Sequence, residues 1–166
     1  LIFLRYGWHR KKNLLFFQGR WRDPKKSEEK ARKARYEFLE NIRHQEMCDA
    51  IAVASHADDQ VETIFFQMLR GTGAKGLSGM SVFSSSRKIF RPLLSVSKKE
   101  ILSALAQEDI SFCTDETNAE SVYSRNFLRN DIFPLLQGRF PSFSSNILRQ
   151  ADIFRQEQGF LQMLLS

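Results

Sequence analysis

The chain has little cysteine and no long apolar run. Its two cysteines, Cys48 and Cys113, fit neither a CxxC motif nor a zinc-ligand spacing, so we expect reduced thiols without a metal-binding or sulfur-transfer role. No apolar segment approaches the roughly 18 residues of a membrane span, which argues against a membrane partner. The opening segment Leu1–Leu4 is too short for a secretory signal, which predicts a cytoplasmic location.

The composition suits a globular protein with an anionic partner. The 166 residues fit one domain, or one domain and the start of a second, and the 15 Phe residues are expected to supply much of the core. Residues 1–43 hold 13 of the 25 Lys and Arg residues against five acids, whereas the remainder carries 12 bases and 14 acids. This asymmetry favours RNA along one face, with a solubilising surface as the alternative.

Hydrophobic periodicity predicts strands that alternate with helices and are followed by helices alone. Strands are expected at Leu1–Leu4, Leu14–Phe17, Asp49–Ser55, Ile89–Leu93 and Ile110–Cys113. Helices are expected at about 27–47, 57–70 and 97–107, and from Tyr123 onward. The pattern predicts an α/β domain with a parallel sheet over residues 1–120 and a helical extension over residues 121–166.

Three acids stand where a buried strand is expected to give way to a helix. Asp58, Asp59 and Glu62 follow the apolar run 50–54 directly. Ligands bind beyond the carboxyl ends of strands in open α/β sheets, and Asp59 and Glu62 share a helix face. Such a pair can hold Mg²⁺ or an ammonium group. The structural alternative is that acids at a helix N-terminus stabilise the helix dipole.

Two neighbouring features are weaker signals. His56 stands at the strand-to-helix turn, where a capping role is the alternative to a direct one. A flexible glycine loop is expected from Gly71 through Gly73 to Gly79, with Gly71 ending the preceding helix at positive φ. Arg70 precedes this loop, whose backbone could approach an anion closely, but its spacing is not that of a Walker loop.

Two arginine pairs are further candidates for anion binding. Arg32 and Arg35 lie on one side of the first predicted helix, where a solvated face is the alternative. Arg125 and Arg129 are four residues apart, a spacing at which an anion between them would remove their mutual repulsion. Asn126 could bind an amide or a base edge.

Taken in order, these segments resemble the tRNA(Ile)-lysidine synthetase family of the PP-loop ATP pyrophosphatase superfamily. The motif at Ser55–Thr63 is followed by a second at Leu69–Met80. Four further segments also match the family, namely Glu28–Tyr36 in the predicted helix, Arg91–Leu94, Asp115–Asn118 and Arg125–Arg129. The likeness covers about residues 27–166.

The resemblance implies the PP-loop (adenine nucleotide alpha hydrolase-like) fold and a ligase. With ATP and Mg²⁺, such enzymes adenylate the wobble cytidine of an isoleucine tRNA with a CAU anticodon, and the lysine amine then displaces AMP. By the same likeness Asp59, Glu62 and Arg125 are catalytic and hold lysine, and Asp58 is a metal-ligand candidate. The residues expected at ATP or tRNA phosphates are Arg32, Arg35, His56, Arg70, Gly71, Gly73, Asn126 and Arg129. A homodimer is compatible with the resemblance.

One departure from the family pattern is the lack of its Ser-Gly-Gly-x-Asp-Ser phosphate loop. We therefore expect an N-terminally incomplete domain that does not hydrolyse ATP alone. Two other interpretations stay open, namely a PP-loop enzyme of tRNA thiolation and a non-catalytic tRNA-binding remnant.

Overall fold

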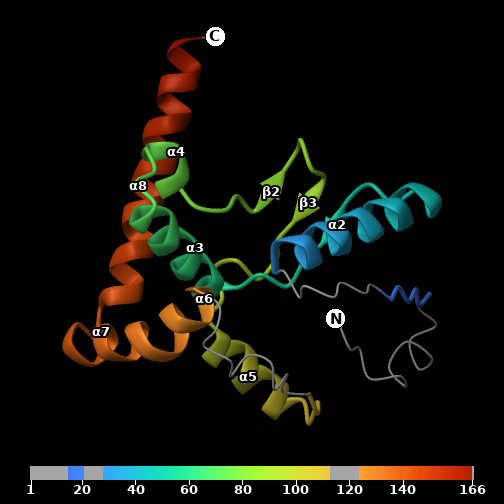
Figure 1. Ribbon diagram of the computed structural model, residues 1–166, viewed down its shortest axis with the longest axis horizontal. Helices are drawn as coiled ribbons and strands as arrows, with labels where there is room; N and C mark the ends of the chain where they lie inside the picture. The colour runs from blue at the N-terminus through green and yellow to red at the C-terminus, as the bar shows by residue number, and fades with distance from the viewer. Residues whose placement is uncertain (1–14, 21–27, 113–123, 166) are drawn as a thin grey trace. The chain divides into compact units, whose positions relative to one another are not determined.

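The computed structural model describes residues 15–20, 28–112 and 124–165 (Figure 1). The chain divides into two compact units. The first comprises Leu1–Val53 and Phe83–Phe90, and the second comprises Ala54–Val82 and Arg91–Ser166. The predicted domain boundary at residue 120 lies outside the described residues and stays a prediction.

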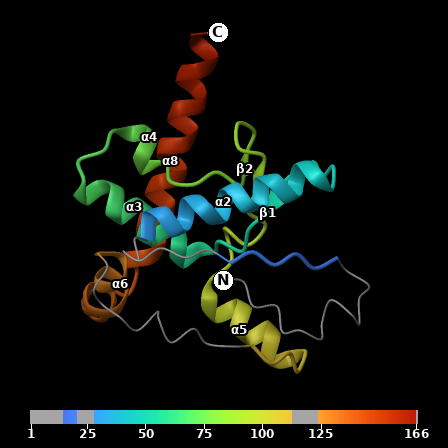
Figure 2. The same ribbon diagram turned by 45° about the vertical axis from the view of Figure 1, so that its right-hand side comes forward.

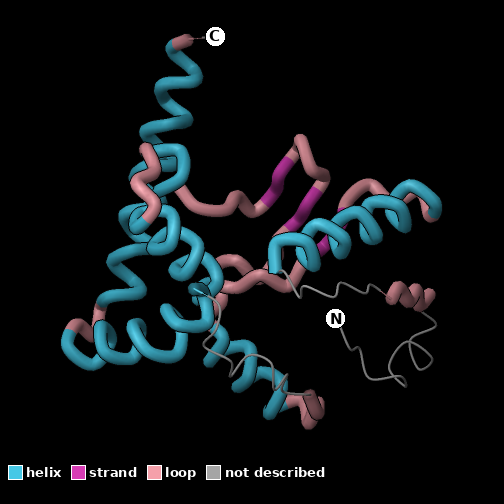
Figure 3. The backbone as a smooth tube through the Cα atoms, viewed as in Figure 1, coloured by secondary structure: helices cyan, strands magenta, loops and turns pink. Residues whose placement is uncertain are grey.

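The first unit contains helix α2 (Glu28–Gln45) and a small sheet. Strands β1 (Ile51–Ala52), β3 (Ile89–Phe90) and β2 (Phe83–Ser84) lie in the order β1-β3-β2 (Figure 3). The β1–β3 pair is parallel, as predicted, while β2 adds an antiparallel neighbour that the periodicity did not predict. Ile51 and Ile89 are partners in register and both are buried, so one face of this sheet packs into the unit.

Two predicted strands are wrong over their described parts. Residues 15–17 form no strand, and Leu15 is exposed, so this run lacks a buried face. Residues 110–112 also form no strand, because the Ile110 amide donates to the carbonyl of Leu105 at 2.8 Å and closes the end of the preceding helix instead. The rest of both segments, and Leu1–Leu4, lie outside the described residues.

The second unit is helical. Its elements are α3 (Ala57–Leu69), α4 (Ala74–Leu77), α5 (Lys98–Gln107), α6 (Ser124–Phe127), the π-helical segment η2 (Leu128–Ile132), α7 (Phe133–Arg139) and α8 (Phe143–Leu164). In both views α4 lies against α8 (Figures 1 and 2). The predicted helix starts near residues 57 and 97 are confirmed. Across the described residues, no helix has both the length and the apolar character needed to cross a bilayer.

An aromatic cluster joins α3 to the C-terminal helices. The ring of Phe65 contacts those of Phe133 and Phe143 edge-on, with centroids 5.4 and 5.6 Å apart. Val61 and Leu128 complete the buried centre of this core. The expectation that phenylalanine supplies much of the core holds only in part, because several other Phe side chains in each unit are exposed.

Helix α5 begins with the capping box that its sequence predicts. The Ser97 hydroxyl accepts from the Glu100 amide at 3.2 Å, and the Glu100 carboxylate accepts from the Ser97 amide at 2.8 Å. Hydrogen bonds from the Ser97 hydroxyl and amide lower the pKa of Glu100 below its usual 4.5. The box therefore satisfies two amides that would otherwise lack partners.

Replacing Ser97 by Ala should lower the free energy of unfolding by about 1 kcal/mol at neutral pH. Because the pKa of Glu100 is lower in the folded chain, its contribution is present above pH 4.5 and is lost as the pH falls through the lowered value. The difference between Ser97→Ala and the parent in urea unfolding should therefore shrink in acid. Ser103→Ala, at an exposed position within α5, is the control and should change little. An equal loss in the two variants would contradict the capping role.

Candidate active site at the start of helix α3

His56 and Asp59 cap the first turn of α3 through two reciprocal hydrogen bonds. The Asp59 carboxylate accepts from the His56 amide at 3.0 Å, and the His56 Nδ1 accepts from the Asp59 amide at 3.4 Å. This is a capping box with histidine at the N-cap position. The structure thus gives His56 the capping geometry that was the alternative to a direct role, and it orients one oxygen of Asp59 toward the backbone.

Asp58 points to the start of another helix. Its Oδ2 accepts from the amide of Lys98, the first residue of α5, at 2.8 Å. The neighbouring Ala57 amide donates to the carbonyl of Val96 at 2.9 Å. Asp58 therefore joins α3 to α5 by satisfying an amide at a helix start that has no partner within its own helix.

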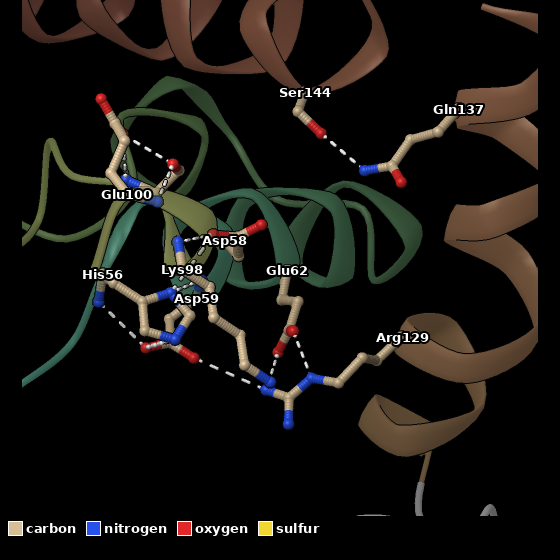
Figure 4. A network of polar contacts seen from close by, with 10 residues as sticks. His56, Asp58, Asp59, Glu62, Lys98, Glu100, Arg129, Gln137 and Ser144 are labelled. Atoms are coloured by element: carbon tan, nitrogen blue, oxygen red, sulfur yellow. Dashed lines mark hydrogen bonds and ion pairs between the residues drawn. The ribbon is translucent and has the colours of Figure 1, made fainter. Parts of the chain in front are cut away.

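Glu62 and Asp59 converge on a single guanidinium group (Figure 4). Arg129 donates from Nε and Nη2 to the two oxygens of Glu62, at 2.6 and 2.8 Å. Its Nη2 also lies 3.5 Å from Oδ1 of Asp59. The Glu62 side chain is 6 % exposed, against 30 % for Asp59 and 37 % for Arg129. The shared helix face predicted for the two carboxylates is thus present, and it holds a cation that comes from η2.

The pairing stabilises the positive charge of Arg129. The hydrogen bond with Glu62 raises the pKa of the guanidinium above its ordinary value, the charges of Glu62, Asp59 and Asp58 raise it further, and burial opposes them. Arg129 is protonated at neutral pH, as arginine is without this pairing, and the pairing favours the charged form further. The site is a compact arrangement of charged groups. Glu62 is the most buried of them, and both of its oxygens accept hydrogen bonds from Arg129.

These carboxylates do not fit a magnesium site by themselves. Mg²⁺ requires oxygen ligands in near-octahedral geometry. Among the described residues no group of three His, Cys, Asp or Glu side chains is placed to hold a metal ion. Asp58 takes the Lys98 amide, and Asp59 takes the His56 amide and faces Arg129. Asp58 is therefore engaged as a hydrogen-bond acceptor at the start of α5 and is not placed to hold a metal ion.

Arg125 and Arg129, four residues apart, take different partners. The Cζ of Arg125, from α6, lies 5.7 Å from the centroid of the Phe66 ring. Arg70, at the end of α3, lies over the same ring at 5.5 Å. Within the described residues neither Arg70 nor Arg125 forms an ion pair with a carboxylate, so two cations gather at one aromatic side chain. Asn126 lies half-buried in α6.

The glycine segment after α3 contains the short helix α4 where a loop was predicted, and it is hydrogen-bonded to α3. Gly71 ends α3 at φ 73°, as predicted, and Gly73 precedes the short helix α4. Gln60 is buried, and its amide group exchanges hydrogen bonds of 2.9 and 2.8 Å with the backbone of Met80. Gly79 has φ 68°, and a Cβ there would stand 2.9 Å from the Gln60 side chain. Sequence reasoning missed Gln60, whose only signal was an amide side chain on an apolar helix face.

The remaining candidates, Arg32 and Arg35, belong to α2 in the first unit. The Cζ of Arg32 lies 5.5 Å from the centroid of the Tyr36 ring, and Arg35 is exposed.

Sequence reasoning also missed a charge pattern. Residues 63–99 contain seven Lys and Arg residues and not one Asp or Glu.

Comparisons with known proteins agree with this architecture. A family model described as a PP-loop domain matches residues 10–136. The tRNA(Ile)-lysidine synthase of Haemophilus ducreyi is 42 % identical over 137 residues, which are 81 % of this chain and 32 % of that protein. Those of Idiomarina loihiensis and Bacillus subtilis are 38 % and 36 % identical, again over 81 % of this chain and over 30 % and 29 % of the relatives. The chain thus spans about 30 % of the length of these relatives.

A solved structure shares the fold. The U34-tRNA thiolase NcsA from Methanococcus maripaludis, with its [4Fe-4S] cluster, superposes with a TM-score of 0.56 at 18 % identity. The match covers 75 % of this chain and 43 % of the thiolase. The predicted fold class, α/β with a helical C-terminal part, is confirmed. The family model, the relatives and the shared fold together show that this chain belongs to the PP-loop domain family, and that over this domain it is similar to the tRNA(Ile)-lysidine synthases.

Proposed function

We propose that this chain is the PP-loop part of a tRNA(Ile)-lysidine synthetase. The reaction joins lysine to the wobble cytidine of isoleucine tRNA with a CAU anticodon. ATP first adenylates the carbonyl oxygen on a ring carbon of the base and releases pyrophosphate. The lysine amine then attacks that carbon, and the new carbon–nitrogen bond forms as AMP leaves with the oxygen. The similarity to relatives with this name supports the proposal. The observation that carries it is the convergence of Asp59 and Glu62 on one cation.

The two carboxylates have different parts in this proposal. Glu62 is engaged through both oxygens by Arg129, so it balances the local charge and fixes that guanidinium. The Oδ1 of Asp59 is 3.5 Å from Arg129 and makes only a charge contact there, so Asp59 is the carboxylate better able to accept a substrate ammonium. The bound ammonium must lose a proton to become the attacking amine, and Asp59 is the base that would receive that proton.

Cationic residues would bind the phosphates of ATP and tRNA. Arg70 and Arg125 meet at Phe66 without a carboxylate among the described residues, which suits an anionic partner. Arg125 also keeps its proposed part in binding lysine, through the carboxylate of that substrate. The other residues proposed to contact these phosphates are Arg32, Arg35, His56, Gly71, Gly73, Asn126 and Arg129. Mg²⁺ bound with ATP, a homodimer and a cytoplasmic location remain part of the proposal.

Lysine incorporation into tRNA by the full-length protein tests the assignment. Asp59→Asn should lower kcat/KM for lysine by roughly 10- to 100-fold, as expected for the loss of one charge-assisted contact, while KM for ATP changes far less. The matched control is Glu40→Gln, which removes a carboxylate from the Arg43 ion pair on α2 and should leave lysine use unchanged.

Three outcomes would overturn the proposal. Equal loss of lysine and ATP use in Asp59→Asn would remove the amine-binding role. Transfer of sulfur to the tRNA would favour a thiolation enzyme. Binding of tRNA without any response to lysine or ATP would favour a non-catalytic remnant.

A further inference from the structure

The antiparallel hairpin of the first unit presents an aromatic face. Phe83 of β2 lies directly opposite Phe90 of β3, so both side chains project from the same side of the sheet. They are 49 % and 41 % exposed. Ala52 of β1 is the next residue in this row and is exposed too. Because Ile51 and Ile89 occupy the opposite, buried face, the two phenylalanines are not needed for the core.

The turn of the same hairpin is cationic. Arg87 and Lys88 are exposed and follow three serines, Ser84–Ser86. They lie within the 37 residues, 63–99, that contain no acid. Within the described part of the chain neither Arg87 nor Lys88 forms an ion pair. The hairpin thus combines exposed rings, unpaired positive charges and hydroxyl donors within eight residues.

This combination matches the chemistry of single-stranded RNA. Bases stack on exposed aromatic rings without regard to sequence, while phosphates follow positive charge. Sheet faces that carry aromatic side chains bind unpaired RNA bases in this way. A purely apolar partner would not use the cations, and an acidic protein would not require flat rings.

We propose that the β2–β3 hairpin, residues 83–90, binds an unpaired segment of RNA. Bases stack on Phe83 and Phe90, and the phosphates contact Arg87 and Lys88. The inference rests on the proposed function in that it takes RNA as the partner, and it adds a contact surface made of residues other than the Asp59–Glu62 carboxylates.

Titration of the chain with a 12-nucleotide oligouridine and with an isoleucine tRNA transcript tests the surface. The double variant Phe83→Ala/Phe90→Ala should weaken binding about tenfold or more without changing its salt dependence. Arg87→Gln/Lys88→Gln should reduce the slope of log K against log salt by about 1.4, for two phosphate contacts. Phe83→Leu, which keeps an apolar side chain without the ring, should also weaken binding, so a general loss of folding cannot explain the result.

Matched controls are Phe160→Ala and Arg149→Gln, which change exposed residues of the same types on α8 and should bind RNA like the parent. Hairpin variants that bind like these controls would overturn the inference. A change in oligomeric state on Phe83→Ala/Phe90→Ala, with unchanged RNA affinity, would also overturn it and identify a second copy as the occupant.

Lysine incorporation by the full-length protein separates this inference from the proposed function. If lysine is incorporated but the hairpin variants bind RNA like the parent, only the hairpin contact is overturned. If the hairpin variants bind RNA more weakly but no lysine is incorporated, the hairpin contact is supported and the proposed ligase activity is overturned.

Discussion

Replacing Glu62 by Gln should lower the free energy of unfolding by roughly 2–3 kcal/mol. The change removes the negative charge and leaves Arg129 one neutral amide oxygen in place of the two carboxylate oxygens that it now contacts at 2.6 and 2.8 Å. Breaking a fully buried ion pair costs about 3–5 kcal/mol, because the remaining charge is left without a partner. The Arg129 side chain is 37 % exposed, so water can solvate part of that charge and the expected cost is smaller. Urea unfolding measures it.

A double-mutant cycle separates the pair from its surroundings. Glu62→Leu/Arg129→Leu removes both charges and should recover much of the stability that Glu62→Leu alone loses. The control pair is Lys33 and Glu37 on α2, exposed and 3.8 Å apart, for which Glu37→Gln should cost less than about 0.5 kcal/mol. Strictly additive losses at Glu62 and Arg129 would show that the two side chains do not stabilise each other.

Truncating Phe133 to Ala should cost about 3–5 kcal/mol, the largest effect expected in this chain. Phe133 is 7 % exposed, and its ring contacts Phe65 at 5.4 Å and Phe143 at 5.5 Å. The truncation removes contacts to α3 and α8 together and leaves a cavity between them. Phe133→Leu should cost less, and Phe140→Ala, at an exposed position in the same segment, is the control.

The same variant tests how Arg129 is positioned. Phe133 directly follows η2, the segment that carries Arg129, and packs it against α3. In the Phe133→Ala background, Glu62→Gln should therefore cost less than in the parent, because the ion pair is already weakened. A full, additive cost in that background would mean that η2 keeps its place without the aromatic cluster.

Local features of the site were predictable because they depend on neighbours in the chain. The start of α3 at residue 57, the positive φ of Gly71 and the Ser97–Glu100 capping box each follow from residue types within a few positions. The same holds for the shared face of Asp59 and Glu62, which helical spacing alone requires. Conversely, residues 15–17 and 110–112 form no strand, because an apolar run becomes a strand only where another strand pairs with it.

The amino-acid sequence by itself determined where the helices of the site begin and which carboxylates stand together on α3. The tertiary structure decided which groups those carboxylates meet. Arg129 reaches Glu62 across 67 residues, Asp58 reaches the Lys98 amide across 40, and Gln60 holds the glycine segment across 20. Spacing along the chain specifies a helix face because each helical turn repeats the same geometry. It does not specify the partner of that face, which depends on how separate segments pack around Phe65, Phe133 and Phe143.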